Sequence, residues 1–312
     1  MLNVMRLRML CELHRRGTLA EVAHALSYTP SAVSQQLSLL ERETGVSLFE
    51  RVGRGVRLTD DAVGLVAHAE AVLARLEQAE SELAAAQPDV RGTLRVASFQ
   101  TVVVELVPPA LTLLAERHPR LQVEIGHREV GPAYEGLLSH RFDVILGEEY
   151  PGLPGEIRTG VDRQDLVRDR LCLAVPATGP WSASPGVLAD LTAAPWAMDP
   201  PATPTGDWSR AVCRAAGFEP RVAFENADPL LQAHLVRSGH AVAFIPALIA
   251  GRHGEGVRLI GLPGDPHRTL HTAVRAGRAG HPAVRAFRAA LAEVAGERVA
   301  TPLAGWLAGR DA

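Results

Sequence analysis

The sequence predicts an α/β protein with a helix-rich N-terminal part: a winged helix-turn-helix, one long linker helix and two Rossmann-like lobes. Two helix start signals lie a few residues apart near the N-terminus, as in a helix-turn-helix. An apolar seam then repeats at three- and four-residue spacing from Ala62 to Leu83, which indicates one long helix. Beyond Pro88, stretches typical of strands and of helices alternate, and this order is typical of a parallel sheet.

The first start signal is a capping box. The Thr18 hydroxyl can accept the free amide of Glu21, and the Glu21 carboxylate can accept the amide of Thr18. The second signal is Thr29 followed by Pro30, because proline at the first helical position loses no hydrogen bond. We therefore expect two helices joined by a tight turn, the second ending at Gly45.

The second helix divides into two faces. Its apolar residues suit packing on the preceding helix. The opposite stripe is polar and consists of Ser31, Ser34, Gln35, Ser38 and Arg42. Serine and glutamine can approach base edges in a major groove, and glutamine can form two hydrogen bonds with adenine. From this helix alone, an ordinary solvated face is the alternative interpretation.

The flanking segments favour DNA binding. Upstream, residues 4–16 form an amphipathic stripe that ends at Gly17, which predicts a third helix. Downstream, Glu50-Arg51-Val52 and Val56-Arg57-Leu58 flank the turn Gly53-Arg54-Gly55, which predicts a hairpin, or wing, with Arg54 at its tip. Such an arginine can contact phosphate or enter a minor groove. Residues 1–58 hold eight arginines against five glutamates, a net charge of +3.

The long helix begins at the cap residue Thr59 and ends near Pro88. Its outer face is acidic, and its single apolar seam is suited to pairing with a second copy of the helix. Packing on its own domain is the alternative. We expect dimerisation, because the small winged domain offers little surface to cover so long a seam.

The remainder predicts two α/β lobes. The first set of elements comprises strands at 93–97, 122–127 and 142–146 with helices at 102–117 and 134–140. The second set comprises strands near 170–175, 196–198, 222–225 and 241–245 with helices near 186–191, 208–216 and 229–238. A last strand at 270–275 and a helix at 283–295 are expected to return to the first lobe. A cleft between such lobes is a common site for small molecules.

Several classes of protein are disfavoured. The chain has 312 residues and is 47% hydrophobic, but it has no apolar run long enough to span a membrane and no signal-peptide core, so we expect a cytoplasmic protein. It lacks a nucleophile elbow, a phosphate loop and paired metal spacing, so we expect no enzyme, no metal and no cofactor. The three cysteines do not suggest a disulfide framework, although Cys172 and Cys213 leave a redox switch as an alternative.

At this point the residues carry a resemblance to a family. The stretches AVSQQL at 32–37, GVSLFER at 45–51 and Leu58-Thr59 stand in the order and spacing of the LysR-type transcriptional regulators. More loosely, RFDVILG at 141–147 and VRSGHAVAFIP at 236–246 also match. The resemblance extends to about residue 297 and leaves a tail at 298–312.

The resemblance implies a domain organisation and partners. Residues 1–58 would bind DNA, 59–87 would form the dimerisation helix, and 88–92 the hinge. Residues 93–297 would resemble type 2 periplasmic binding proteins, with lobe I at about 93–165 and 266–297 and lobe II at about 166–265. The implied partners are a double-stranded DNA operator, a small-molecule effector, a second copy of the chain in a homodimer usually doubled to a homotetramer, and RNA polymerase as a candidate.

The resemblance also assigns DNA contacts. The contact residues would be Pro30, Ser31, Ser34, Gln35 and Ser38 on the recognition helix and Arg54 on the wing. The family often has glutamine where this chain has Pro30, so sequence choice would depend more on Ser34 and Gln35. The family's Leu-Thr-x-Ala-Gly is replaced by residues 58–62, LTDDA, so the junction of wing and linker helix is expected to pack differently.

In the family, the effector lies between the lobes and contacts the loop after the first strand. Here that loop would be Ser98, Phe99, Gln100 and Thr101, and the opposing loops would contribute Val130, Glu148, Thr203, Phe224 and Asn226. Thr101 stands at the start of a helix, which favours an anion, so the sequence predicts a carboxylate-bearing effector. Glu148 and Glu149 would argue for an amine instead if they face the cleft. A sensor that binds a protein partner, or responds to redox change, is the alternative.

Overall fold

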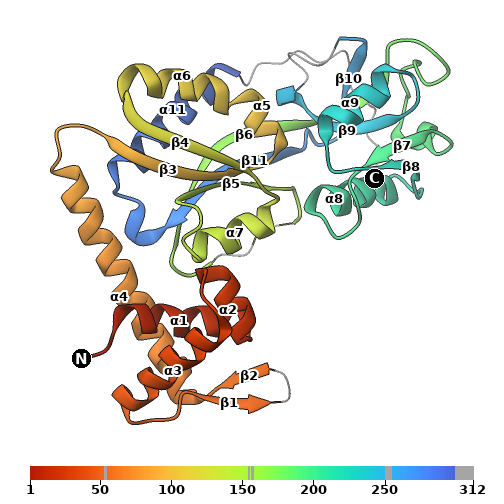
Figure 1. The fold of residues 1–312 in the computed structure, drawn as a ribbon. Helices are drawn as coiled ribbons and strands as arrows, with labels where there is room; N and C mark the ends of the chain where they lie inside the picture. Colours follow the sequence, from red (N-terminus) through yellow and green to blue (C-terminus); the bar gives the residue numbers. More distant parts are fainter. Residues whose placement is uncertain (53–54, 154, 156–157, 250–254, 299–312) are drawn as a thin grey trace.

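The computed structural model describes residues 1–52, 55–153, 155, 158–249 and 255–298. A small helical domain lies at one end of the molecule, and the long helix α4 leads from it to a larger α/β part made of two lobes (Figure 1). Among the described residues, no helix combines the length and the apolar character that crossing a membrane requires.

The N-terminal domain contains the predicted helix-turn-helix. Its helices are α1 (Val4–Arg16), α2 (Leu19–Leu26) and α3 (Pro30–Thr44). The Thr18 hydroxyl accepts the amide of Glu21 at 3.2 Å, and the Thr29 hydroxyl accepts the amide of Ala32 at 3.2 Å, so both predicted cap hydroxyls are confirmed. The reciprocal half of the capping box, from the Thr18 amide to the Glu21 carboxylate, is not formed among the described residues. The three helices enclose one apolar core, whose fully buried members include Leu10, Val22, Val33, Leu37 and Leu40.

A two-stranded hairpin follows α3. Strands β1 (Phe49–Val52) and β2 (Gly55–Leu58) pair antiparallel, with Phe49 opposite Leu58. The amide of Val56 donates to the carbonyl oxygen of Gly17 at 3.3 Å, which attaches the hairpin to the turn before α2. The tip of this hairpin, including the predicted contact residue Arg54, lies outside the described residues.

Helix α4 (Asp60–Ala85) starts at Thr59, whose hydroxyl accepts the amide of Ala62 at 3.2 Å. The predicted seam divides along its length. Its first part packs into the N-terminal domain, where Ala62, Val66 and Ala69 are buried, so the intrachain alternative holds there. Its second part, beginning with Val72, faces solvent.

The sheet of lobe I has the order β4-β3-β5-β11-β6. Its strands are β3 (Arg91–Ser98), β4 (Arg120–His127), β5 (Val144–Glu149), β11 (His267–Arg275) and the first part of β6 (Val161–Pro176). Strand β3 pairs parallel with β4 and β5, as the βαβαβ pattern predicts. Helices α5 (Gln100–Glu105), α6 (Val107–Arg117) and α11 (Pro282–Arg298) cover one face, and α7 (Val130–Leu138) covers the other.

Lobe II continues the same sheet through β6. Beyond Arg170, β6 pairs with β9 (Val242–Pro246) and β10 (Val257–Gly261), and β7 (Pro195–Met198) and β8 (Arg221–Glu225) follow. Helix α8 (Pro204–Ala215) packs on one face and α9 (Pro229–Arg237) on the other. Strand β6 is continuous and belongs to both lobes. Its partner changes from β11 to β9 near Leu171, so the lobes meet there and not near the predicted residue 166.

Three predicted elements differ from the structure. The helix predicted at 102–117 is interrupted at Leu106, because Pro108 and Pro109 have no amide hydrogen and therefore begin a new helix. The helix predicted near 186–191 is a single 3-10 turn, Leu188–Leu191. Strand β10 was not predicted, and β6 begins at Val161 instead of the predicted residue 170.

The N-terminal part is docked on lobe I. Arg8 of α1 donates to the carbonyl oxygen of Ser139 at 3.0 Å, just after α7. On α4, the Ser81 hydroxyl donates to the carbonyl oxygen of Gly277 at 3.0 Å. A Cβ atom at Gly277 would lie 2.3 Å from the carbonyl oxygen of Ala74, so only glycine allows this close approach. The linker helix and lobe I are therefore fitted to each other.

Candidate functional site

The outer face of α3 is polar and open to solvent. Pro30, Ser31 and Gln35 are exposed, whereas Ser34 and Ser38 are half-buried. The Ser31 hydroxyl lies 3.1 Å from that of Thr29, so it is held at the first turn of the helix. The structure therefore brings the five predicted residues of α3 to one end and one side of the helix.

Two adjacent glutamines on α3 have different surroundings. The Gln36 side chain faces α1 and accepts a hydrogen bond from Arg6 Nε at 2.9 Å. The Gln35 amide makes no hydrogen bond with any described residue. Its donor and acceptor atoms are therefore free for a partner outside the chain.

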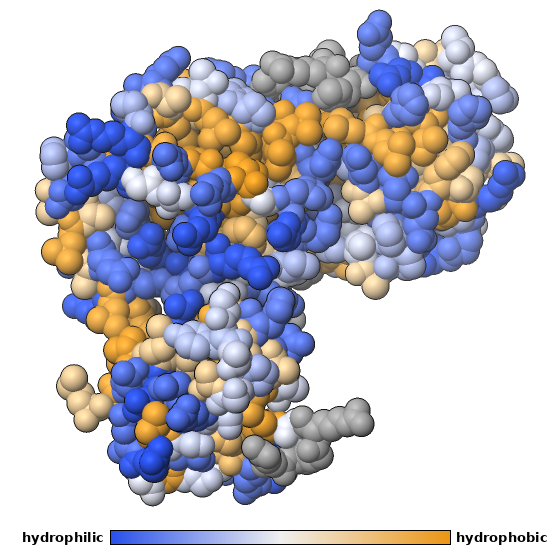
Figure 2. Space-filling view, in the orientation of Figure 1, coloured by the Kyte–Doolittle hydropathy of each residue, from blue (hydrophilic) through white to orange (hydrophobic). Residues whose placement is uncertain are grey.

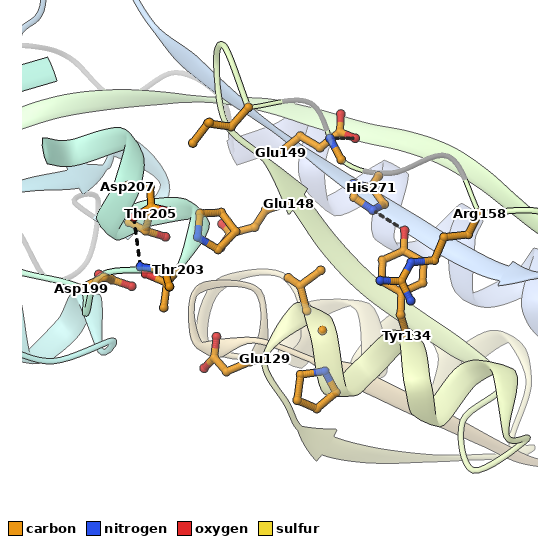
Figure 3. Close-up of a pocket in the computed structure, with 17 residues that line it drawn as sticks. Glu129, Tyr134, Glu148, Glu149, Arg158, Asp199, Thr203, Thr205, Asp207 and His271 are labelled. Atoms are coloured by element: carbon orange, nitrogen blue, oxygen red, sulfur yellow. Dashed lines mark hydrogen bonds between the residues drawn. The ribbon is translucent and has the colours of Figure 1, made fainter. Parts of the chain in front are cut away.

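A cavity of about 560 Å³ lies between the two lobes (Figure 3). Asp199, Thr203, Thr205 and Asp207 of lobe II lie on one side of it, and Tyr134, Arg158 and His271 of lobe I lie on the other (Figure 3). A smaller space of about 40 Å³ adjoins it and is lined by Phe99, Gln100 and Thr101, among others. Glu129, Glu148, Asp199 and Thr205 line both spaces.

One buried cation organises the inner end of the cavity. Arg268 on β11 is 2% exposed and lies between carboxylates on the two neighbouring strands. Its Nη2 atom is 2.7 Å from Asp169 Oδ2 on β6, and its Nη1 atom is 2.6 Å from Glu148 Oε2 on β5. The Tyr150 hydroxyl also donates to Glu148, at 3.2 Å, and itself accepts from the Thr205 hydroxyl of lobe II at 2.9 Å. A continuous polar network therefore links the lobes.

The two other acidic side chains at this end, Asp199 and Glu129, are less strongly paired than Glu148. Asp199 follows β7 directly, and its Oδ1 atom accepts a hydrogen bond from the neutral amide of Gln232 at 2.7 Å. Burial raises the pKa of Asp199 to about 6, and the negative charges of Glu148 and Glu129 add to this effect. The carboxylate of Glu129, at the start of α7, forms no hydrogen bond or ion pair with the described residues.

Six of the nine predicted effector residues line these spaces, and three do not. The lining residues are Phe99, Gln100, Thr101, Val130, Glu148 and Thr203. Ser98 is fully buried and donates to the carbonyl oxygen of Phe99 at 3.4 Å. Phe224 packs in the core of lobe II, and Asn226 Oδ1 accepts the amide of Asp228 at 3.2 Å. These three side chains make contacts within the chain and do not line the two described spaces.

Asp199, Tyr134 and Arg268 were not among the residues predicted to line the cavity. Asp199 could have been found, because it is the first polar residue after a buried strand, where ligands of open sheets bind. Tyr134 was included only as the start of a predicted helix. Arg268 carried no local signal, because its partners Asp169 and Glu148 lie 99 and 120 positions away.

The cysteines are poorly placed for redox chemistry. All three are buried, and burial raises the pKa of Cys172 and of Cys213 to about 12, which disfavours the reactive thiolate. On β6, Leu171 and Leu173 pack in the same core as Cys213, whereas Cys172 points to the opposite face of the sheet. A disulfide between Cys172 and Cys213 would therefore have to cross the sheet.

Comparison with known families matches two parts of the chain. Residues 4–63 match the family described as bacterial regulatory helix-turn-helix protein, lysR family, and residues 87–296 match the LysR substrate binding domain. These two matches cover the N-terminal domain with the start of α4 and both lobes.

Individual relatives agree with the family matches. The HTH-type transcriptional regulator GbpR of Azospirillum brasilense is 27% identical over 80% of this chain and 73% of its own. A probable hydrogen peroxide-inducible genes activator of Streptomyces viridosporus is 31% identical over 47% of each chain. The structure of a full-length OxyR variant from Pseudomonas aeruginosa is similar in fold, with a TM-score of 0.64 at 21% identity over 93% of this chain and 95% of the other.

We predict that replacement of Asp199 changes how stability depends on pH. Folding raises the pKa of this carboxyl group, so its contribution to stability is present at low pH and is lost as the pH rises through about 6. Asp199→Asn should therefore be more stable than the wild type at pH 7.5, by up to about 2–3 kcal/mol, and the gap should close towards pH 5. Urea unfolding at both pH values checks this. A gap that is the same at pH 5 and at pH 7.5 would contradict it.

Proposed function

The chain belongs to the LysR family of transcriptional regulators, and from this premise we propose that it binds a specific DNA operator through α3 under the control of a small molecule held between its lobes. The family consists of regulators rather than enzymes. The observation that carries the proposal for DNA is the free, exposed amide of Gln35 on a helix that two caps hold in place.

In this proposal, α3 lies in the major groove with its N-terminal end towards the bases. Gln35 would form two hydrogen bonds with an adenine, and Ser31 and Ser34 would contact base edges or backbone. Pro30 presents no amide to a base, so Gln35 carries more of the sequence choice. Arg54 at the wing tip is proposed to contact phosphate or the minor groove.

Helix α7 connects the cavity with the N-terminal domain and is our proposed route for effector control. Glu129 and Val130 at its start line the cavity, and Tyr134 follows one turn later. At its other end, the carbonyl oxygens of Leu138 and Ser139 accept hydrogen bonds from Arg15 and Arg8 of α1 (Figure 1). A ligand that binds two positions of α7 unequally would shift the position of α1, and so of the DNA-binding helices.

The exposed part of α4 supports a homodimer. Val72, Leu76 and Leu83 are 45%, 44% and 71% exposed, and with Ala79 they recur at four- and three-residue spacing on one side of the helix. Figure 2 shows apolar side chains along α4 between the N-terminal domain and lobe I. The spacing is that of a coiled-coil seam, and a second copy of α4 is the occupant that repeats it.

A second apolar surface supports doubling of the dimer. Strand β4 lies at the edge of the sheet, so its outer backbone groups have no strand partner. Its side chains Leu121, Val123 and Ile125 are only partly buried, as is Leu113 on the neighbouring α6. We propose that this surface joins two dimers into a tetramer, in which the effector changes the angle between dimers and the bend of the DNA.

Redox control is the competing proposal, and it finds one point of support. A relative is named as a hydrogen peroxide-inducible genes activator, although the match covers less than half of either chain. Against this, Cys172 and Cys213 are buried on opposite faces of the sheet. Control by a ligand in the cavity is therefore favoured over control by a disulfide.

The two adjacent glutamines provide a matched test of DNA recognition. On an operator selected from random DNA by the full chain, Gln35→Ala should weaken binding by about 1–3 kcal/mol and leave binding to random DNA nearly unchanged. Gln36→Ala is the control, because its side chain is bonded to Arg6. Fluorescence anisotropy measures both affinities. Equal losses on both DNAs would show that α3 does not read sequence.

Charges in the exposed seam should separate the dimer. Leu76→Glu combined with Leu83→Glu places four carboxylates in the paired seam, so the dissociation constant should rise at least about 100-fold. Gln78→Glu is the control, since Gln78 lies on another side of α4. Sedimentation or light scattering gives the mass. An unchanged dimer in the double variant would remove α4 from the interface.

Arg8→Ala should loosen the contact between α1 and α7. The guanidinium donates to the Ser139 carbonyl, so its loss should speed hydrogen exchange at the end of α7, near residues 136–141, by several-fold. Arg16→Ala is the control, because Arg16 bonds Glu12 within α1. Mass spectrometry locates the exchange. Equal exchange in α7 in both variants would exclude this contact as the route.

A further inference from the structure

The inner end of the cavity between the lobes has more acidic groups than cations. Glu129, Glu148 and Asp199 line both the larger space and the smaller one beside it. The buried guanidinium nearby, Arg268, is already shared between Glu148 and Asp169. One cation therefore faces four carboxyl groups at this end.

The cations at the other end do not offset this excess. Arg158 lies with its guanidinium carbon 4.5 Å from the centre of the Tyr134 ring, across the cavity from Asp199 (Figure 3). His271 accepts or donates a hydrogen bond with the Tyr134 hydroxyl at 3.1 Å, and burial lowers the pKa of His271 to about 4, so its ring is neutral at pH 7. The acidic groups therefore outnumber the one cation, Arg158, that lines the larger space.

A threonine whose hydroxyl has no hydrogen-bond partner among the described residues also lies at the acidic end. Thr101 is 1% exposed and lines the smaller space, yet its hydroxyl forms no hydrogen bond with any described residue. A hydroxyl that borders the cavity without an intrachain partner is available as a donor or acceptor to a ligand atom. It is independent of the carboxylates, because it belongs to α5 and they do not.

An anion is disfavoured in the same place. The sequence predicts a carboxylate because Thr101 starts a helix, but α5 contains only six residues and has a correspondingly weak dipole. A carboxylate there would lie among Glu129, Glu148 and Asp199, and like charges at short range repel strongly in a partly buried site. The acidic lining therefore outweighs the helix start.

We propose that the effector carries a protonated amine or guanidinium group, bound at the inner end of the cavity by Glu129 and Asp199 with the Thr101 hydroxyl as a further partner. This inference rests on the proposed control by a small molecule and specifies its chemistry. The body of the effector extends past Val130 towards Tyr134.

The same arrangement gives the cation a way to move the lobes. Asp199 belongs to lobe II, whereas Glu129 starts α7 of lobe I. Without a cation the two carboxylates repel each other across the cavity, and a cation between them attracts both. Binding therefore draws lobe II towards the start of α7, the helix whose other end contacts α1.

The test is a thermal-shift panel on the full chain without DNA. The amine probes are putrescine, cadaverine, agmatine, spermidine, lysine and arginine, and the matched probes are succinate, glutarate, adipate and 1,4-butanediol. At least one amine should raise Tm with increasing concentration. In Glu129→Gln/Asp199→Asn its apparent affinity should fall at least 10-fold, whereas Glu135→Gln, on the exposed side of α7, should keep it.

The outcomes separate this inference from the proposed function. Stabilisation by dicarboxylates alone overturns the amine and leaves effector control in place. Stabilisation by an amine that the double variant retains overturns the assignment to Glu129 and Asp199. A panel without any stabilising amine also overturns the inference, whereas operator recognition is judged separately by Gln35→Ala.

Discussion

The sensor depends on the buried guanidinium of Arg268. It lies opposite Asp169 on β6 and diagonal to Glu148 on β5, so one side chain connects the adjacent strands β5, β11 and β6. Asp169 also accepts the amide of Leu248 at 3.0 Å, which ties in the segment that returns from lobe II. Such a charge is tolerated in the interior only because two carboxylates surround it, and losing it would leave two buried acids uncompensated.

This constraint determines what the cavity can hold. Since Arg268 is engaged by two carboxylates, its attraction for Asp199 is outweighed by burial, and the inner end of the cavity stays acidic. Its guanidinium carbon lies 5.7 Å from the centre of the Phe99 ring, which holds the loop after β3 against the same network. The structural ion pair and the chemistry of the site are therefore two consequences of one arrangement.

The sequence was most informative where structure is local. Caps such as Thr18 and Thr29 act over three residues, so the helix-turn-helix could be predicted closely. The seam of α4 was predicted correctly as apolar, but its first half packs into the N-terminal domain and its second half faces solvent, a difference that periodicity does not reveal. Arg268 was out of reach, because its pairing depends on strands that are neighbours only in the folded sheet. Phe224 packs against the core of lobe II, because neighbouring residues of a strand point to opposite faces and the sequence alone does not fix which face is inward.

The position of α7 explains how lobe I can border the cavity and also contact the N-terminal domain. Its first turn borders the cavity, and its last carbonyl groups accept Arg8 and Arg15 from the N-terminal domain. Beside it, Arg275 at the end of β11 donates to the carbonyl oxygen of Leu137 and pairs with Glu77 of α4. A shift of α7 must therefore change hydrogen bonds to both α1 and the linker helix, and the free energy of ligand binding can act on the DNA-binding surface only through such unequal contacts.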